Sequence, residues 1–163
     1  MAKQLCLLLA AASVCLAQQA VTSSKTTHVI LPAKAVKWEA CAPGLPQAPG
    51  LQCAVLAGDP SKAGEPYVLR FTTPDGYMVP PHWHPMDEHV TVISGTLMVG
   101  MGEKLVESDL RPLGPGGFLM MPQKMPHYAR MKGKTVADVY GVGPFEINYV
   151  NPADDPRTKA TSK

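Results

Sequence analysis

Metal-capable side chains gather in one short stretch of a sequence that is otherwise sparing with them. The stretch is Gly76-Tyr-Met-Val-Pro-Pro-His-Trp-His-Pro-Met-Asp-Glu-His89, which holds three of the five histidines in the chain. With the two-residue period of a β-strand, His82 and His84 point to the same face. Glu88 joins them on that face if the strand resumes after the proline. Imidazole nitrogens and carboxylate oxygens together favour divalent transition metals.

The face that carries these groups is otherwise apolar. The same parity continues through Val90 and Val92, so this face should turn toward the interior. An ionised Glu88 buried there is costly without a partner, and neutral imidazoles do not offset that cost. A divalent cation bound by these groups would offset that cost. A third imidazole is available at His127, on a separate predicted strand that an antiparallel sheet can bring alongside.

A first motif of the cupin superfamily coincides with this stretch. Gly76, His82, His84, Glu88 and Gly95 are separated by five, one, three and six residues, without a gap in the pattern. The sequence therefore resembles a cupin in the region where its metal-capable residues lie.

A second motif resembles the other cupin signature, with two departures. Gly116, Pro122, Lys124 and His127 follow one another with intervals of five, one and two residues. Lys124 stands where the family usually has glycine, which implies a differently shaped turn. Met131 stands where the motif usually ends in asparagine, which implies a more apolar interior. The resemblance extends over residues 67–140.

The resemblance implies an all-β fold, a double-stranded β-helix of the jelly-roll type that forms a small barrel. It implies one divalent metal held by His82, His84, Glu88 and His127. Fe(II) or Mn(II) is the expected ion, because four protein ligands leave two positions open in a six-coordinate site; Zn(II) is the alternative, and could close a tetrahedral site. His89 has the opposite parity and is excluded as a ligand.

Three functions are compatible with such a site. The first is a dioxygenase-type oxidoreductase acting on a small metal-chelating substrate, with Glu88 as the catalytic residue that also shuttles a proton. The second is a metal-dependent lyase or isomerase that uses the ion as a Lewis acid, with Asp87 or His89 as a candidate base. The third is a non-catalytic protein that binds metal or a small ligand. Tyr128 and Arg130 are weaker candidates for substrate contacts, because their parity opposes that of His127.

The rest of the composition predicts a single β-rich domain. The chain has 163 residues, with 17 prolines and 14 glycines, which favour short strands and turns. A net charge of +2 does not indicate a nucleic-acid partner or a membrane patch. A hairpin turn is expected at Ser94-Gly95, an edge strand or packed arm within residues 144–150, and a homodimer by analogy with other cupins. The six predicted strands are residues 67–72, 89–93, 96–99, 118–121, 128–131 and 136–140.

The N-terminal residues predict export. A lysine, an apolar run from Leu5 to Leu16 and small residues near Ala17 are typical of a cleaved signal peptide over residues 1–17, so we expect a periplasmic or secreted protein. Cleavage would leave Cys41 and Cys53, which form either a disulfide or two buried thiols. The predicted organisation continues with an N-terminal arm and strands (18–66), the barrel core (67–143) and a C-terminal arm with a polar tail (144–163).

Overall fold

The fold is built almost entirely from antiparallel strands. The computed structural model describes residues 28–41 and 50–159. The strands are β1 (Gln52–Gly58), β2 (Pro66–Thr73), β3 (Met78–Trp83), β4 (Glu88–Met101), β5 (Arg111–Leu113), β6 (Phe118–Met121), β7 (His127–Val142) and β8 (Asn148–Tyr149). Short helical turns lie before, between and after them, namely η1 (Ala33–Ala35), η2 (Glu107–Asp109), η3 (Pro152–Asp154) and α1 (Pro156–Lys159). None of these described helices has the length and apolar character needed to cross a membrane.

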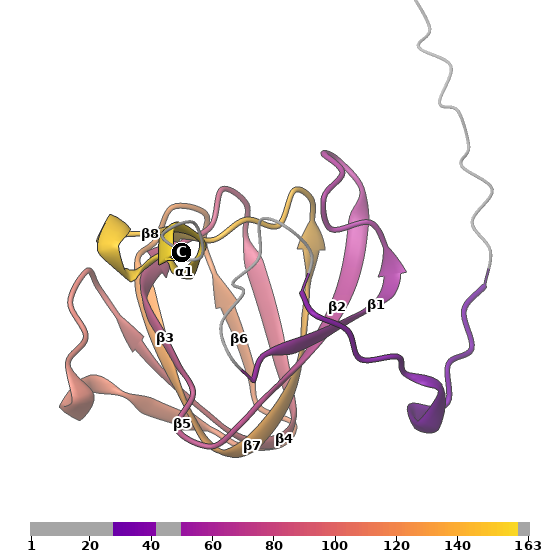
Figure 1. Cartoon of the computed structure of the whole chain (residues 1–163), viewed down its shortest axis with the longest axis horizontal. Coiled ribbons are helices and arrows are strands. Elements are labelled where there is room, and N and C mark those ends of the chain that lie inside the picture. The colour runs from indigo at the N-terminus through magenta and orange to yellow at the C-terminus, as the bar shows by residue number, and fades with distance from the viewer. Residues whose placement is uncertain (1–27, 42–49, 160–163) are drawn as a thin grey trace, which may run out of the picture.

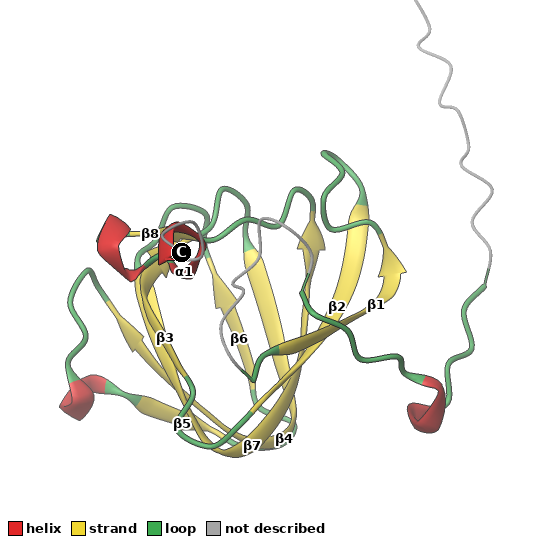
Figure 2. Cartoon of the chain, viewed as in Figure 1, coloured by secondary structure: helices red, strands yellow, loops and turns green. Residues whose placement is uncertain are grey.

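The strands form one curved sheet around an interior. Its hydrogen-bonded order is β1-β2-β7-β3-β8, and β4 pairs with β5, β6 and β7. The long strand β7 therefore contacts three others, and it bends so that two wings of the sheet face each other (Figures 1 and 2). This arrangement confirms the predicted all-β, jelly-roll fold class.

The predicted hairpin at Ser94-Gly95 is wrong. Residues 89–93 and 96–99 are two halves of the single strand β4, which pairs along its length with β7. Gly95 marks a bulge, because the register against β7 shifts on either side of Ser94. Gly95 has a φ of 76°, and a Cβ there would lie 2.5 Å from the carbonyl oxygen of Lys134. The glycine thus lets two strands approach closely, instead of reversing the chain.

Strands β1 and β5 were not predicted. Strand β3, which the histidine spacing implied without bounds, contains Pro80-Pro81, which removes two backbone donors. The structure accommodates the prolines by a break in pairing with β7 between Val79 and His82. At the other end of the chain, only Asn148–Tyr149 within the predicted segment 144–150 forms a strand, and it pairs with β3.

The core lies between the two wings and includes a disulfide. Cys41 and Cys53, which the sequence left open between two states, are bonded to each other and are both buried. Their neighbours in the core cluster include Tyr67, Leu69 and Val139. The bond ties the segment before β1 to the sheet, and Glu39 adds a β-bridge to Cys53. The predicted signal peptide, residues 1–17, lies outside the described residues.

Candidate metal centre

Four metal-capable side chains from three parts of the fold meet at one end of the interior. His82 is near the end of β3, and its register partner across the sheet is His127, the first residue of β7. His84 follows in the turn after β3, and Glu88 opens β4. All four are buried, with exposed fractions of 3–8%. Ligand-capable nitrogens of the three histidines all lie within 4.8 Å of one another.

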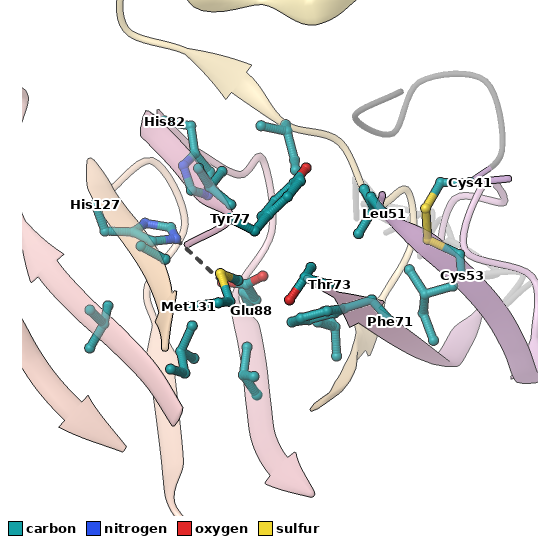
Figure 3. A pocket seen from close by; sticks show the side chains of 18 of the residues that line it. Cys41, Leu51, Cys53, Phe71, Thr73, Tyr77, His82, Glu88, His127 and Met131 are labelled. Atoms are coloured by element: carbon teal, nitrogen blue, oxygen red, sulfur yellow. Dashed lines mark ion pairs between the residues drawn. A yellow bond between two sulfur atoms is a disulfide. The ribbon is translucent and has the colours of Figure 1, made fainter. Parts of the chain in front are cut away.

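The carboxylate completes the cluster. Glu88 Oε2 lies 3.4 Å from His84 Nε2 and 3.4 Å from His127 Nε2. Figure 3 shows Glu88 and His127 approaching each other, with His82 beside them. The structure thus brings together all four residues that the sequence assigned to the metal.

Backbone carbonyls orient all three rings in the same way. Nδ1 lies 2.7 Å from Pro80 O in His82, 2.7 Å from Glu146 O in His84 and 3.0 Å from Met125 O in His127. A carbonyl oxygen only accepts, so each Nδ1 must be the donor, and in a neutral ring Nε2 then carries a lone pair. This is the arrangement by which second-shell carbonyls orient histidine ligands in metal sites.

One of the inward-facing nitrogens lacks a hydrogen-bond partner. Among the described residues, His84 Nε2 is buried without a hydrogen bond, and when the ring is neutral its 3.4 Å approach to Glu88 Oε2 brings two lone-pair-bearing atoms together. A cation between such atoms would turn this repulsion into coordination. The donor set, three imidazole nitrogens and one carboxylate, suits a divalent transition metal. The residues present therefore fit a divalent metal ion.

The pKa values of the clustered residues are also consistent with a cation site. Burial, together with the neighbouring rings of His127 and His84, lowers the pKa of His82 to about 3, so this ring stays neutral. Burial acts to raise the pKa of Glu88, but the imidazoles of His84 and His127 outweigh it, and the pKa lies below its usual range. For His84, burial lowers the pKa and the charge of Glu88 raises it, with a net rise. An ionised carboxylate is thus held inside the protein, beside groups that can share a cation with it.

The turn before β7 holds two of the ligands in place. Lys124 donates its backbone N–H to His84 O at 2.8 Å, and Met125 O accepts from the His127 ring. Lys124 has a φ of 60°, the left-handed conformation that glycine adopts most readily. The departure from the family pattern at this position has therefore kept a glycine-like backbone.

We expect Lys124→Gly to stabilise the protein. The left-handed conformation strains a lysine but not a glycine, whereas glycine gives the unfolded chain more entropy. The net change should raise the free energy of unfolding by about 0.5–1 kcal/mol. Urea denaturation of both proteins measures this difference. Lys132→Gly, at an exposed position of β7 that does not have a positive φ, should instead be destabilising. An equal loss at both positions would contradict the strain at Lys124.

A cavity of about 90 Å³ opens beside the cluster (Figure 3). His82, Glu88 and His127 line it, whereas His84 does not and instead stacks its ring on Phe145 at 5.1 Å. Apart from these residues, Thr73 and Tyr77, the lining that the described part of the chain provides is apolar. A metal held by the four ligands would therefore face a largely apolar chamber.

The other positions that the sequence singled out divide between the cavity and the outside. Met131 lines the cavity. Tyr128 donates its hydroxyl to Val106 O, and Arg130 pairs with Glu107, so neither contacts the cavity. His89 lies on the opposite face of β4, where its ring stacks on Tyr140.

Sequence reasoning missed Thr73 and the disulfide as parts of the cavity wall. Leu69, Phe71 and Thr73 alternate along β2 and all line the cavity. The two-residue period was visible in the sequence, but nothing in it showed that this face of β2 would meet the metal-capable residues.

Comparison with known proteins supports the same fold. Residues 69–143 match the family described as the cupin domain. No curated protein matches the chain.

Solved structures with this fold include several enzymes. The polyketide cyclase RemF from Streptomyces resistomycificus superposes with a TM-score of 0.64 at 19% identity, covering 82% of this chain and 93% of its own. A candidate acetylacetone dioxygenase from Methylibium petroleiphilum gives 0.60 at 15% identity, covering 86% and 98%. The DMSP lyase DddQ from Ruegeria pomeroyi gives 0.51 at 22% identity, covering 68% and 57%. At these identities the likeness shows the fold alone. Because residues 69–143 match the cupin domain and lie within a curved antiparallel sheet of this fold, this part of the chain is a cupin domain.

Proposed function

We propose that this protein is a metal-dependent cupin enzyme of the dioxygenase type, acting on a small molecule that chelates the metal. The observation that carries the proposal is the convergence of oriented imidazole Nε2 atoms and an ionised carboxylate at the wall of an apolar cavity. Iron or manganese is the ion proposed, because four protein ligands leave two adjacent positions in a six-coordinate site.

The residues of the chain have separate roles in this proposal. His82, His84 and His127 hold the ion, and the carbonyls bonded to their Nδ1 atoms keep the rings oriented. Glu88 lowers the charge of the site and can carry a proton to or from the substrate. The apolar lining excludes water, which strengthens the electrostatic interactions inside. A bound divalent ion would acidify a coordinated substrate hydroxyl and bring the substrate beside dioxygen.

The lyase or isomerase alternative has less support, because it needs a general base close to the substrate. Asp87 is exposed and accepts the backbone N–H of Gln123, and His89 faces away. Tyr77 lines the cavity, but burial raises its pKa to about 12, which makes it a poor base at neutral pH. Among the described residues this leaves Glu88, which is already assigned to the metal.

Metal analysis combined with oxygen uptake tests the proposal. The protein, purified without chelators or a His-tag, should carry near-stoichiometric iron or manganese and consume oxygen with pentane-2,4-dione or catechol. Glu88→Ala should abolish the uptake. Zinc content with no oxygen uptake would contradict the proposal and favour Lewis-acid chemistry. Metal retention without turnover of any kind would favour the binding-protein alternative.

We further propose that the protein is exported and forms a homodimer, with a small molecule as its other partner. The Cys41–Cys53 disulfide supports export, because such bonds persist in oxidising compartments. N-terminal sequencing of the protein from the exported fraction, and light scattering in solution, test these two points.

A further inference from the structure

Thr73 presents a buried hydroxyl to the cavity. It is the last residue of β2, its exposed fraction is 1%, and its Oγ1 has no hydrogen-bond partner among the described residues. Thr73 lines the cavity, and Figure 3 shows its hydroxyl between Phe71 and Glu88. A buried hydroxyl without a partner costs free energy. Valine has nearly the same shape and would avoid that cost.

Neighbouring threonines show that this position is unusual. Thr135, the register partner of Thr73, is also fully buried, but its hydroxyl lies 3.1 Å from Gly133 O. Thr72 is buried and also has an unpartnered hydroxyl, but it does not line the cavity. Thr73 thus combines an unsatisfied hydroxyl with a place in the wall of the chamber beside the metal-capable residues.

The chemistry of the chamber restricts what could meet this hydroxyl. Among the described residues no lysine or arginine lines the cavity, so a phosphate or a second carboxylate on a ligand would be buried there without a counter-charge from them. Most of the residues that line the cavity are apolar, with Leu69, Phe71 and Met131 among them. The volume of about 90 Å³ is smaller than the roughly 150 Å³ of a cavity that binds benzene. A short apolar body with a neutral polar end matches these limits.

We propose that Thr73 is a second anchor for the substrate, a positioning residue that shares a hydrogen bond with a neutral oxygen at the end remote from the metal. The substrate is then a small molecule with chelating oxygens at one end, a short apolar middle and a hydroxyl or carbonyl at the other. This inference rests on the proposed function, because it assumes that the chelating end binds a metal at His82, Glu88 and His127.

A series of hydroxamic acids provides probes, because the two hydroxamate oxygens chelate divalent transition metals. Linear alkyl hydroxamic acids of increasing length are compared with counterparts of equal length that end in a hydroxyl. Isothermal titration calorimetry on the metal-loaded protein gives the affinity of each. At the chain length that reaches Thr73, the hydroxyl-ended probe should bind about fivefold more tightly than the alkyl probe, the value of one neutral hydrogen bond.

Three variants separate positioning from structure. Thr73→Val should abolish the preference for the hydroxyl-ended probe while leaving the affinity for alkyl probes nearly unchanged. Thr73→Ser keeps the hydroxyl and should retain the preference. Thr72→Val is the matched control, a buried and unpartnered threonine outside the cavity, and should also retain it. Both valine variants should raise the melting temperature by about 2–4 °C, because each removes an unsatisfied buried hydroxyl.

The outcomes distinguish this inference from the function on which it rests. If probes bind only to the metal-loaded protein but show no hydroxyl preference at any length, or one that survives Thr73→Val, the role of Thr73 is overturned and the metal site stands. If no hydroxamate binds in a metal-dependent way, the proposed function is overturned, and the second anchor with it.

Discussion

Replacing His127 by alanine is expected to weaken metal binding by about a hundredfold. Structural metal sites with four ligands are worth roughly 10–16 kcal/mol, so the loss of one ligand costs about 3 kcal/mol. At a metal concentration 1,000 times the dissociation constant, binding stabilises the folded protein by about 4 kcal/mol. The variant should lose most of that stabilisation. Competition with a chromophoric chelator measures the affinity, and thermal unfolding with added metal measures the stability.

Two controls test this prediction: a second histidine variant, His89→Ala, and a chelator experiment on His127→Ala itself. His89→Ala removes an imidazole next to Glu88, but on the opposite face of β4, and should keep full metal content. With excess chelator, the stability difference between wild type and His127→Ala should shrink, because metal then stabilises neither protein. Full metal occupancy in both His127→Ala and Glu88→Ala would show that these residues are not ligands.

Loss of the disulfide is expected to have the second largest effect. The bond closes a loop with a sequence separation of 12, for which chain entropy predicts a stabilisation of about 3 kcal/mol. Changing Cys41 and Cys53 together to alanine should therefore lower the melting temperature by roughly 6–12 °C. Both sulfurs belong to the buried core and to the wall of the cavity, so packing adds to this loss.

Reduction of the wild-type protein provides the matched control. A reductant should lower the stability of the wild type to near that of the double variant, and should leave the double variant unchanged. If the double variant unfolds at the wild-type temperature and the reductant has no effect, the disulfide contributes nothing to the fold. Calorimetry of the four samples gives the comparison.

The grouping of the metal-capable residues could be predicted from the sequence because it depends on local periodicity. The two-residue period places Glu88 and His89 on opposite faces of one strand, and the spacing of the first cupin motif assigned His82 and His84 to the same set as Glu88. The all-β class followed from the frequent turn residues and the cupin motifs. These features are local, so they are visible without knowledge of which strand pairs with which.

Longer-range features depended on the tertiary structure. Gly95 reads as a hairpin turn, but the close approach of β4 to β7 makes it a bulge within a continuous strand. The proline-rich strand β3 exists because its ends pair with β7, and sequence propensity alone disfavours it. In both cases hydrogen bonding with β7 outweighed the preference of the local residues for a turn or against a strand.

The contents of the cavity were also decided by the tertiary structure. The Cys41–Cys53 bond comes from a segment far from the histidines in sequence, and Thr73 from the preceding strand, where only the register of β2 against β7 directs its face toward them. A shift of one residue in that register would exchange the two faces of the strand. The sequence by itself determined which side chains could bind a metal, while the pairing of distant strands decided which walls surround them, because side-chain period is local and strand register is not.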